Sequence, residues 1–260
     1  MKPIEPLNPG PDEANRERIR DFWTRNVNAE KLFGKPVTEH PRGESGYFQD
    51  LETQRYRSHR HLLPWIRQMR AGASVLEIGC GVGMDSLQMA RHGLRVTGID
   101  LTEVAVQTAA RRFAALGLAA QFRTGDATAL EFDDARFDYV YSFGVLHHCQ
   151  DTEQSIREVY RVLKPGGVAL IMLYNRHSLN ELVHRITRVP FEDRNELCPV
   201  VRRFTRAEVR SMFAQFSSLT IAKDFVYGEG YGAVFDLTPA FLYRALSRTL
   251  GWHLMITGVK

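Results

Sequence analysis

Short apolar runs along the chain alternate with longer segments in which apolar residues recur at helical spacing. The short runs predict β-strands, and the longer segments predict α-helices between them. This alternation is typical of a doubly wound α/β fold, in which helices cover both faces of a parallel sheet. The predicted strands occupy residues 74–79, 95–100, 119–123, 138–143, 167–174, 218–227 and 251–258.

Local signals place several of the helices. Asp151 with Gln154, and Thr205 with Glu208, have the spacing of capping boxes, so each pair predicts a helix start. An apolar stripe recurs with the helical period in the segment before Gly117. The predicted helices occupy residues 13–26, 51–69, 101–116, 152–163, 206–215 and 239–249.

Two segments exceed the minimal fold, one before the first strand and one after the fifth. Ligands of open α/β sheets bind beyond the carboxyl ends of the strands, so we expect both segments to form a lid there. The predicted organisation is a leader with a helical lid (1–70), a ligand-binding core (71–174), a lid insertion (175–203) and the C-terminal part of the sheet (204–260).

Composition fits one soluble domain, with 44% hydrophobic and 25% charged residues among 260. The longest clean apolar stretch, 168–173, is far shorter than the ~18 residues that cross a bilayer, so we expect no membrane insertion. The start lacks the apolar segment of an export signal, which favours the cytoplasm. Cys80, Cys149 and Cys198 are too few and too dispersed for a disulfide framework or a metal site.

Charge is unevenly distributed along the chain. Residues 1–70 carry 13 basic and 10 acidic side chains, residues 71–170 carry 9 and 12, and residues 171–260 carry 12 and 8. The basic flanks would suit an anionic small-molecule acceptor. The alternative is an ordinary solvated surface, because acids are interleaved with the arginines. No basic stripe suited to a nucleic acid stands out.

The segment VLEIGCGVGMDS (75–86) carries the most specific signal. Its glycines follow an apolar strand and let the backbone turn sharply beside a ligand. The dinucleotide pattern fails at its last position, because counting from Gly79 reaches Met84 and counting from Gly81 reaches Ser86. A strand-end carboxylate, Glu77, would repel a pyrophosphate but suits a ligand with ammonium and sulfonium groups. S-adenosylmethionine is such a ligand.

With these residues the chain resembles the class I S-adenosylmethionine-dependent methyltransferases, in particular the small-molecule branch with a methyltransferase type 11-like domain. The resemblance extends over about 100 residues. It rests on four further segments, which are RVTGID ending at Asp100, GDA at 125–127, FDYVYSFGVLHHCQD at 137–151 and LKPGGVALIMLY at 163–174.

The resemblance implies a Rossmann-like sheet of seven strands, mostly parallel, with the last strand reversed. It implies S-adenosyl-L-methionine as cofactor and S-adenosyl-L-homocysteine as product. Glu77 would lie near the methionine amino group, Asp100 would bind the ribose and Asp126 the adenine. The implied cofactor-binding set is Glu77, Gly79, Cys80, Gly81, Gly83, Asp100, Leu101, Asp126, Ala127, Phe143 and Gly144.

Three residues are candidates for catalysis. His147 and His148 follow the fourth strand, on the side where the methyl group of the cofactor should point, and one of them could act as general base. The alternative is that one histidine only braces the loop. Tyr56, in the predicted lid, could contact the acceptor or the cofactor carboxylate, or simply pack on its helix.

The sequence thus predicts an S-adenosylmethionine-dependent methyltransferase (EC 2.1.1) that transfers a methyl group to a small molecule by direct displacement. SFGV stands where amino-methylating nucleic-acid enzymes carry a Pro-Pro motif, which disfavours nucleic acid. The alternatives are an RNA or protein methyltransferase, or a non-catalytic S-adenosylmethionine-binding regulatory protein. The acceptor and the oligomeric state stay open.

Overall fold

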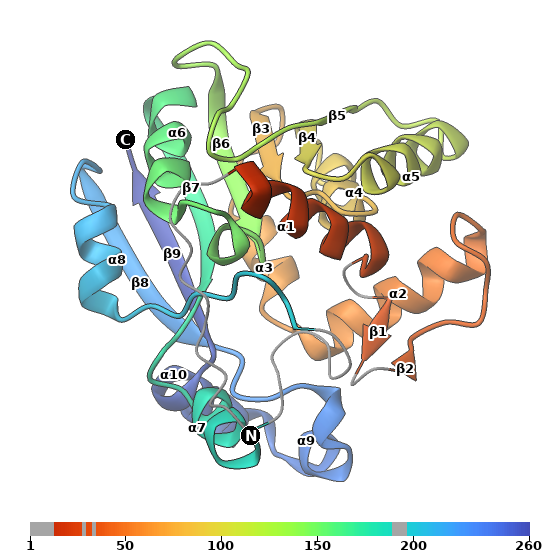
Figure 1. Ribbon diagram of the computed structural model, residues 1–260, viewed down its shortest axis with the longest axis vertical. Helices are drawn as coiled ribbons and strands as arrows, with labels where there is room; N and C mark the ends of the chain where they lie inside the picture. Colours follow the sequence, from red (N-terminus) through yellow and green to blue (C-terminus); the bar gives the residue numbers. More distant parts are fainter. Residues whose placement is uncertain (1–12, 28–29, 33–34, 189–196) are drawn as a thin grey trace.

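The computed structural model describes residues 13–27, 30–32, 35–188 and 197–260. A seven-stranded sheet forms its centre, in the order β5-β4-β3-β6-β7-β9-β8 (Figure 1). The strands are β3 (Ser74–Ile78), β4 (Arg95–Asp100), β5 (Gln121–Thr124), β6 (Phe137–Phe143), β7 (Leu163–Tyr174), β8 (Ser218–Asp224) and β9 (His253–Val259). Only β9 runs antiparallel to its neighbours, so the predicted seven-stranded, mostly parallel sheet is confirmed.

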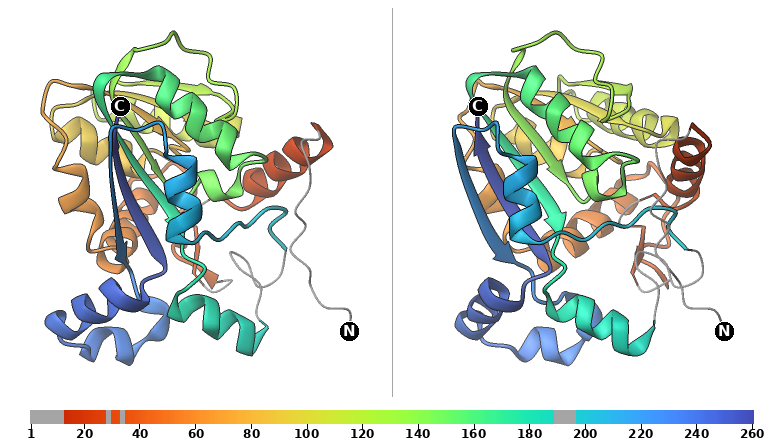
Figure 2. Two further views of the ribbon diagram at one scale, coloured as in Figure 1. Left: turned by 90° about the vertical axis from the view of Figure 1, so that its left-hand side faces the viewer. Right: turned by 60° about the vertical axis from the view of Figure 1, so that its left-hand side comes forward.

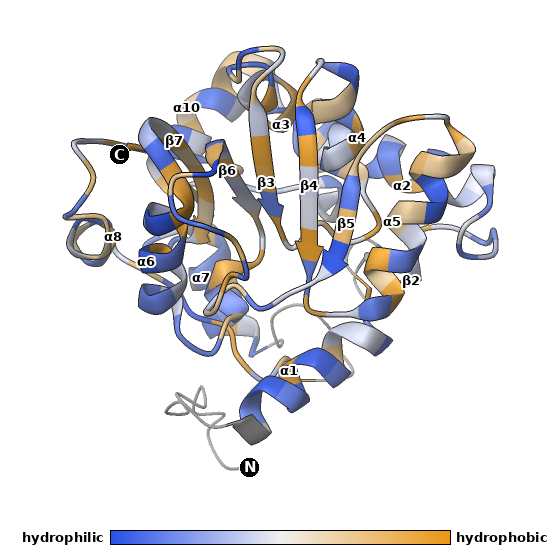
Figure 3. Ribbon diagram, turned by 90° about the horizontal axis from the view of Figure 1, so that it is seen from above, coloured by the Kyte–Doolittle hydropathy of each residue, from blue (hydrophilic) through white to orange (hydrophobic). Residues whose placement is uncertain are grey.

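Apolar side chains cover both faces of this sheet. On one face, strand residues pack against α6 (Thr152–Val162) and α8 (Arg206–Met212). On the other face they pack against α3 (Leu62–Ile66) and α4 (Met84–Arg91). Figure 3 shows β6, β3, β4 and β5 side by side, with α5 (Glu103–Ala115) near β5. This two-sided burial explains why the central strands are continuous apolar runs.

Capping side chains start two of these helices as predicted. Asp151 accepts a hydrogen bond from the backbone of Gln154 at 2.9 Å. Thr205 and Glu208 form a complete capping box at the start of α8. The predicted start of the fifth strand is wrong by four residues, because β7 begins at Leu163 and includes the Pro-Gly-Gly segment through a register shift against β6.

The single helix predicted over 51–69 is also wrong, because α2 (Ser45–Ser58) ends and α3 begins after a short break. His59 leaves the helical conformation, with φ −105° and ψ 63°. Pro64 then lies in the first turn of α3, where a missing backbone N–H costs little. A proline inside a continuous helix would clash with the preceding turn, so Pro64 itself was the sequence signal for a break between two helices.

The remaining elements lie beyond the carboxyl edge of the sheet. On the N-terminal side they are α1 (Glu13–Arg25) and the small strands β1 (Lys31–Leu32) and β2 (Lys35–Pro36). On the C-terminal side they are α7 (Leu179–Thr187), a 3-10 turn at Glu229–Tyr231, α9 (Ala233–Leu237) and α10 (Ala240–Leu250), which gather at one end of the molecule (Figures 1 and 2). Within the described residues, no helix has the length and apolar character needed to cross a membrane.

Candidate functional site

The glycine-rich turn joins β3 to α4. Gly79, Gly81 and Gly83 have φ angles of 77°, 51° and 77°, a region that side chains rarely adopt. A Cβ atom on Gly79 would overlap Val145, whereas one on Gly81 would meet no described atom within 4 Å. Gly79 is therefore required for packing, and Gly81 leaves open space beside the turn.

The backbone N–H groups of this turn are used within the protein. Those of Gly79 and Cys80 donate to the Ile99 carbonyl at 2.8 and 2.9 Å, and that of Gly83 donates to the Cys80 carbonyl at 2.9 Å. The Gly81 N–H donates to Asp100 Oδ2 at 3.0 Å. A turn that cradles a pyrophosphate would instead direct such groups at the ligand.

A cavity of about 1130 Å³, open to solvent at its mouth, lies against this turn at the carboxyl ends of β3, β4 and β6. Among the residues predicted to contact the cofactor, those on the lining are Glu77, Gly79, Cys80, Gly81, Asp100, Leu101, Asp126, Ala127, Phe143 and Gly144. Gly83, the N-cap residue of α4, is not on the lining, and a Cβ atom there would lie 3.1 Å from Ala109.

Helix α1 supplies an apolar wall of the cavity, through Ile19 and Trp23, followed by Val27 just after the helix. Arg16, on the same helix, lies 3.6 Å from Asp126 Oδ2. The sequence predicted that this helix belongs to a lid, but it gave no role to Arg16 or Ile19. Their helical spacing, at i and i+3, was the available signal.

Two acids of the lining are held by short polar contacts. Asp100 Oδ1 accepts from the backbone and the hydroxyl of Thr102, at 2.9 and 2.8 Å. Asp126 Oδ1 accepts from the backbone and the hydroxyl of Thr128, at 2.8 and 2.7 Å. Burial raises the pKa of Asp100, although its hydrogen bonds act in the opposite direction. Both carboxylates are thus oriented before any ligand arrives.

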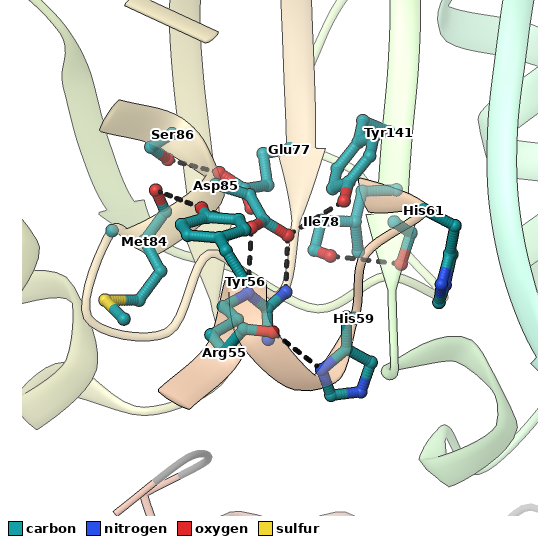
Figure 4. A network of polar contacts seen from close by, with 12 residues as sticks. Arg55, Tyr56, His59, His61, Glu77, Ile78, Met84, Asp85, Ser86 and Tyr141 are labelled. Carbon is teal, nitrogen blue, oxygen red and sulfur yellow. Dashed lines mark hydrogen bonds and ion pairs between the residues drawn. The ribbon is translucent and has the colours of Figure 1, made fainter. Parts of the chain in front are cut away.

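A buried ion pair that the sequence did not predict closes one side of the cavity (Figure 4). Arg55 Nε donates to Asp85 Oδ1 at 2.8 Å, and Arg55 Nη2 contacts Asp85 Oδ2. The hydroxyls of Tyr56 and Tyr141 lie 2.9 and 2.8 Å from the same carboxylate. Burial alone would raise the pKa of Asp85, but the Arg55 charge and these hydrogen bonds lower it.

Glu77 lies in the same buried region and accepts a hydrogen bond from Ser86 Oγ (Figure 4). Burial, reinforced by the Asp85 charge, raises the pKa of Glu77 well above its ordinary range. The described lining of the cavity carries two arginines and four acidic side chains, which are Glu77, Asp85, Asp100 and Asp126. A positive charge is the ligand chemistry that this lining favours.

The structure does not bring Tyr56 to the cavity lining. Its hydroxyl is directed at Asp85 and also lies 3.0 Å from the Met84 carbonyl. Burial raises the pKa of Tyr56, so the phenol stays protonated and acts as a donor. The hydroxyl of Tyr56 is thus used within the protein, and the catalytic role of Tyr56 stays a prediction.

The two candidate histidines lie in a 3-10 turn, Leu146–His148, and diverge. His148 lines the cavity and contacts Trp23 at 4.9 Å between ring centroids. His147 does not line the cavity and packs on Tyr174, with 3.7 Å between centroids. Burial lowers the pKa of His147 well below its ordinary value. Of the two histidines, only His148 is on the cavity lining.

A cluster of aromatic and histidine rings lies behind Phe143. His59 stacks on Phe225 and on His253, with centroids 4.6 and 5.6 Å apart. His61 Nε2 lies 3.3 Å from His253 Nδ1. Burial lowers the pKa of His59 to about 3 and that of His253 well below its ordinary value. These rings are held neutral in the folded protein.

The cysteines on the lining, Cys80 and Cys149, are poor nucleophiles. Burial raises the pKa of Cys149 to about 12 and that of Cys80 well above its ordinary value. Among the described residues, no group of three His, Cys, Asp or Glu side chains is placed to hold a metal ion.

The fold is the Rossmann-like α/β fold of the class I S-adenosylmethionine-dependent methyltransferases. Residues 76–171 match the family model described as a methyltransferase domain, and proteins of this family use S-adenosylmethionine as methyl donor. Residues of the chain are 36% identical over 109 residues to phosphoethanolamine N-methyltransferase 3 of Arabidopsis thaliana, covering 42% of this chain and 22% of that protein. The chain is also 39% identical over 106 residues to the ubiquinone biosynthesis O-methyltransferase of Caulobacter vibrioides. This match covers 40% of this chain and 42% of that protein.

Among solved structures, the crystal structure of the [4+2]-cyclase SpnF superposes with a TM-score of 0.61. The superposition covers 96% of this chain and 97% of that protein. The sequence identity is 19%, so this similarity shows the fold alone. The chain spans less than half the length of both curated relatives named above.

Proposed function

We propose that the protein transfers a methyl group from S-adenosylmethionine to a small molecule. The observation that carries this proposal is the chemistry of the site: the glycine-rich turn uses its N–H groups internally, while the lining carries four acidic side chains against two arginines. Such a site suits a cationic adenosine derivative and disfavours a dinucleotide.

The residues divide into groups by the part of the cofactor that they would hold. Asp100 would accept the ribose hydroxyls, and Asp126 with Ala127 would bind the adenine. Glu77 would lie near the ammonium group, and Arg55, fixed by Asp85, would pair with the carboxylate. When bound, the sulfonium supplies a methyl group that is already activated, so the chain needs only to orient the acceptor and exclude water.

We propose His148 as the general base. Its Nδ1 lies 2.7 Å from the carbonyl oxygen of Val200. A carbonyl only accepts, so Nδ1 carries the proton in this contact and Nε2 has the lone pair. An imidazole held in this tautomer can take a proton from an acceptor hydroxyl or ammonium group.

The acceptor is proposed to be a small molecule that enters between α1 and the 3-10 turn of His148. The two relatives are named for N- and O-methylation, which leaves the acceptor atom open. An anionic acceptor, predicted from the basic flanks, stays a prediction, because both arginines on the described lining lie beside carboxylates.

Asp100→Ala is expected to weaken binding of S-adenosylhomocysteine at least tenfold, since a hydrogen bond to a charged group contributes about 1.5–3 kcal/mol. Titration calorimetry measures this change. Asp138→Ala is the matched control, because that carboxylate is also hydrogen-bonded, to Ser74, but sits at the amino end of β6. Tight NAD binding by the unaltered protein, or normal binding by the Asp100 variant, would contradict the cofactor assignment.

His148→Asn is expected to lower kcat for methyl transfer about 100-fold while leaving cofactor affinity unchanged, as a lost general base does. His147→Phe, which preserves packing on Tyr174 away from the cavity, is expected to keep kcat within about twofold. The substrate for this assay comes from incubating the protein with methyl-labelled cofactor and host extract, then identifying the labelled product by mass. Labelled RNA or protein would favour those acceptor classes, and binding without any labelling would favour a regulatory role.

A further inference from the structure

Exposed apolar side chains gather at one end of the molecule. Nine large hydrophobic residues are exposed in the described part of the chain, and seven of them lie on α7, α9 and α10. The most exposed are Leu237, Phe241 and Ile186, at 79%, 73% and 72%. We call these seven residues the apolar face, and they are Leu182, Ile186, Val234, Leu237, Phe241, Leu242 and Leu250.

These residues are not needed to hold the three helices together. A separate set of buried side chains, centred on Val226, Phe235 and Tyr243 with Leu179 and Leu246 beside them, already packs the helices on each other. The two further views in Figure 2 agree in placing α7, α9 and α10 together beyond the carboxyl edge of the sheet. Exposed apolar side chains that gather in one region beyond what packing requires are typical of an interaction site.

Positive charge accompanies the apolar face. Arg185 on α7, Arg188 just after it, and Arg244 and Arg248 on α10 are exposed and form no ion pair within the described residues. Among the acidic groups nearby, Glu181 is buried with Arg203 3.2 Å away, and Glu229 and Asp236 share Arg57, each at 2.7 Å.

We propose that this face docks the protein on the surface of an anionic lipid bilayer. Helices with Leu, Ile and Phe on one side and arginines beside them lie in the interfacial region of a membrane without crossing it. The apolar side chains would enter the acyl boundary, and the arginines would contact anionic headgroups. The cavity opens at the same carboxyl edge of the sheet, so docking would bring it close to the membrane surface.

The test is flotation of the full chain with vesicles of phosphatidylcholine alone and of phosphatidylcholine with phosphatidylglycerol. We expect binding to the anionic vesicles, weakened by salt. The triple variant Ile186→Gln, Leu237→Gln, Phe241→Gln is expected to bind them at least tenfold more weakly. Leu116→Gln is the matched control, since Leu116 is 49% exposed but follows α5, outside the apolar face.

The charge contribution is tested separately by Arg244→Gln and Arg248→Gln, each expected to weaken binding about fivefold at low salt. The salt dependence of vesicle binding by the full chain measures the overall contribution of charge to docking. The proposal is overturned if the unaltered protein ignores anionic vesicles, or if the triple variant and Leu116→Gln bind alike. It is also overturned if the protein is a dimer in light scattering that the triple variant dissociates, because the face would then bind a second copy.

Discussion

Asp85→Ala is expected to lower the free energy of unfolding by about 3–5 kcal/mol. The Asp85 side chain is 1% exposed and that of Arg55 is 11% exposed, so removing the carboxylate leaves a buried guanidinium without its counter-ion. The hydroxyl of Tyr141 loses its acceptor at the same time, whereas that of Tyr56 keeps the Met84 carbonyl. Urea unfolding followed by circular dichroism measures the change, and cofactor affinity should fall with it, since Arg55 lines the cavity.

Arg57→Ala is the control for this prediction, because it breaks an ion pair from the same helix. Arg57 is exposed and lies 2.7 Å from both Glu229 and Asp236, and exposed pairs contribute at most about 1 kcal/mol. The double variant Arg55→Met, Asp85→Leu should recover much of the lost stability, since it removes both charges together. Equal losses for Asp85→Ala and Arg57→Ala would show that burial of the Arg55 pair has been misjudged.

The central strands and the glycine-rich turn were predictable from sequence, because strands buried on both faces are continuous apolar runs. The proximity of Glu77, Asp100 and Asp126 was predictable for a related reason. Parallel strands end at one edge of the sheet, so acids at or just after the ends of β3, β4 and β5 must meet there.

The Arg55–Asp85 pair was not predictable, since the two residues are 30 positions apart and belong to different predicted segments. An arginine on a predicted helix is more often solvated than buried, and no periodicity reports its partner. His147 and His148 were indistinguishable for a different reason. They are neighbours in a 3-10 turn, and only the three-dimensional path of that turn decides which of the two rings lies at the cavity.

The histidine cluster depends on topology in the same way. His59 and His253 are separated by most of the chain, and they stack because β9 returns antiparallel beside β7 with its first residue at the carboxyl edge. Only the family resemblance implied the reversal of the last strand, so the pattern of apolar and polar residues alone could not bring these rings together.

Acidification from pH 6.5 to pH 5 is expected to destabilise the protein through this cluster. The folded state holds His59 neutral down to a pKa of about 3, whereas the unfolded chain binds a proton near pH 6.5. The contribution of neutral His59 to the free energy of unfolding is therefore complete above pH 6.5. It falls as pH decreases, by about 2 kcal/mol at pH 5. Burial lowers the pKa of His61 to about 4, so its contribution falls in the same window.

His59→Phe isolates this effect. Phenylalanine can keep the stacking on Phe225, and the Arg55 carbonyl retains the backbone N–H of residue 59 as a donor at 2.8 Å. Glu77 has the opposite effect on how stability depends on pH. Because its pKa is raised, the folded state binds this proton at a higher pH than the unfolded chain does, so acidification stabilises the protein through Glu77. The decisive quantity is thus the difference between the unfolding free energies of the two proteins, measured by urea at several pH values. We expect the variant to lose about 2 kcal/mol less than the unaltered protein between pH 6.5 and pH 5, and parallel curves would mean that His59 is protonated in the folded state.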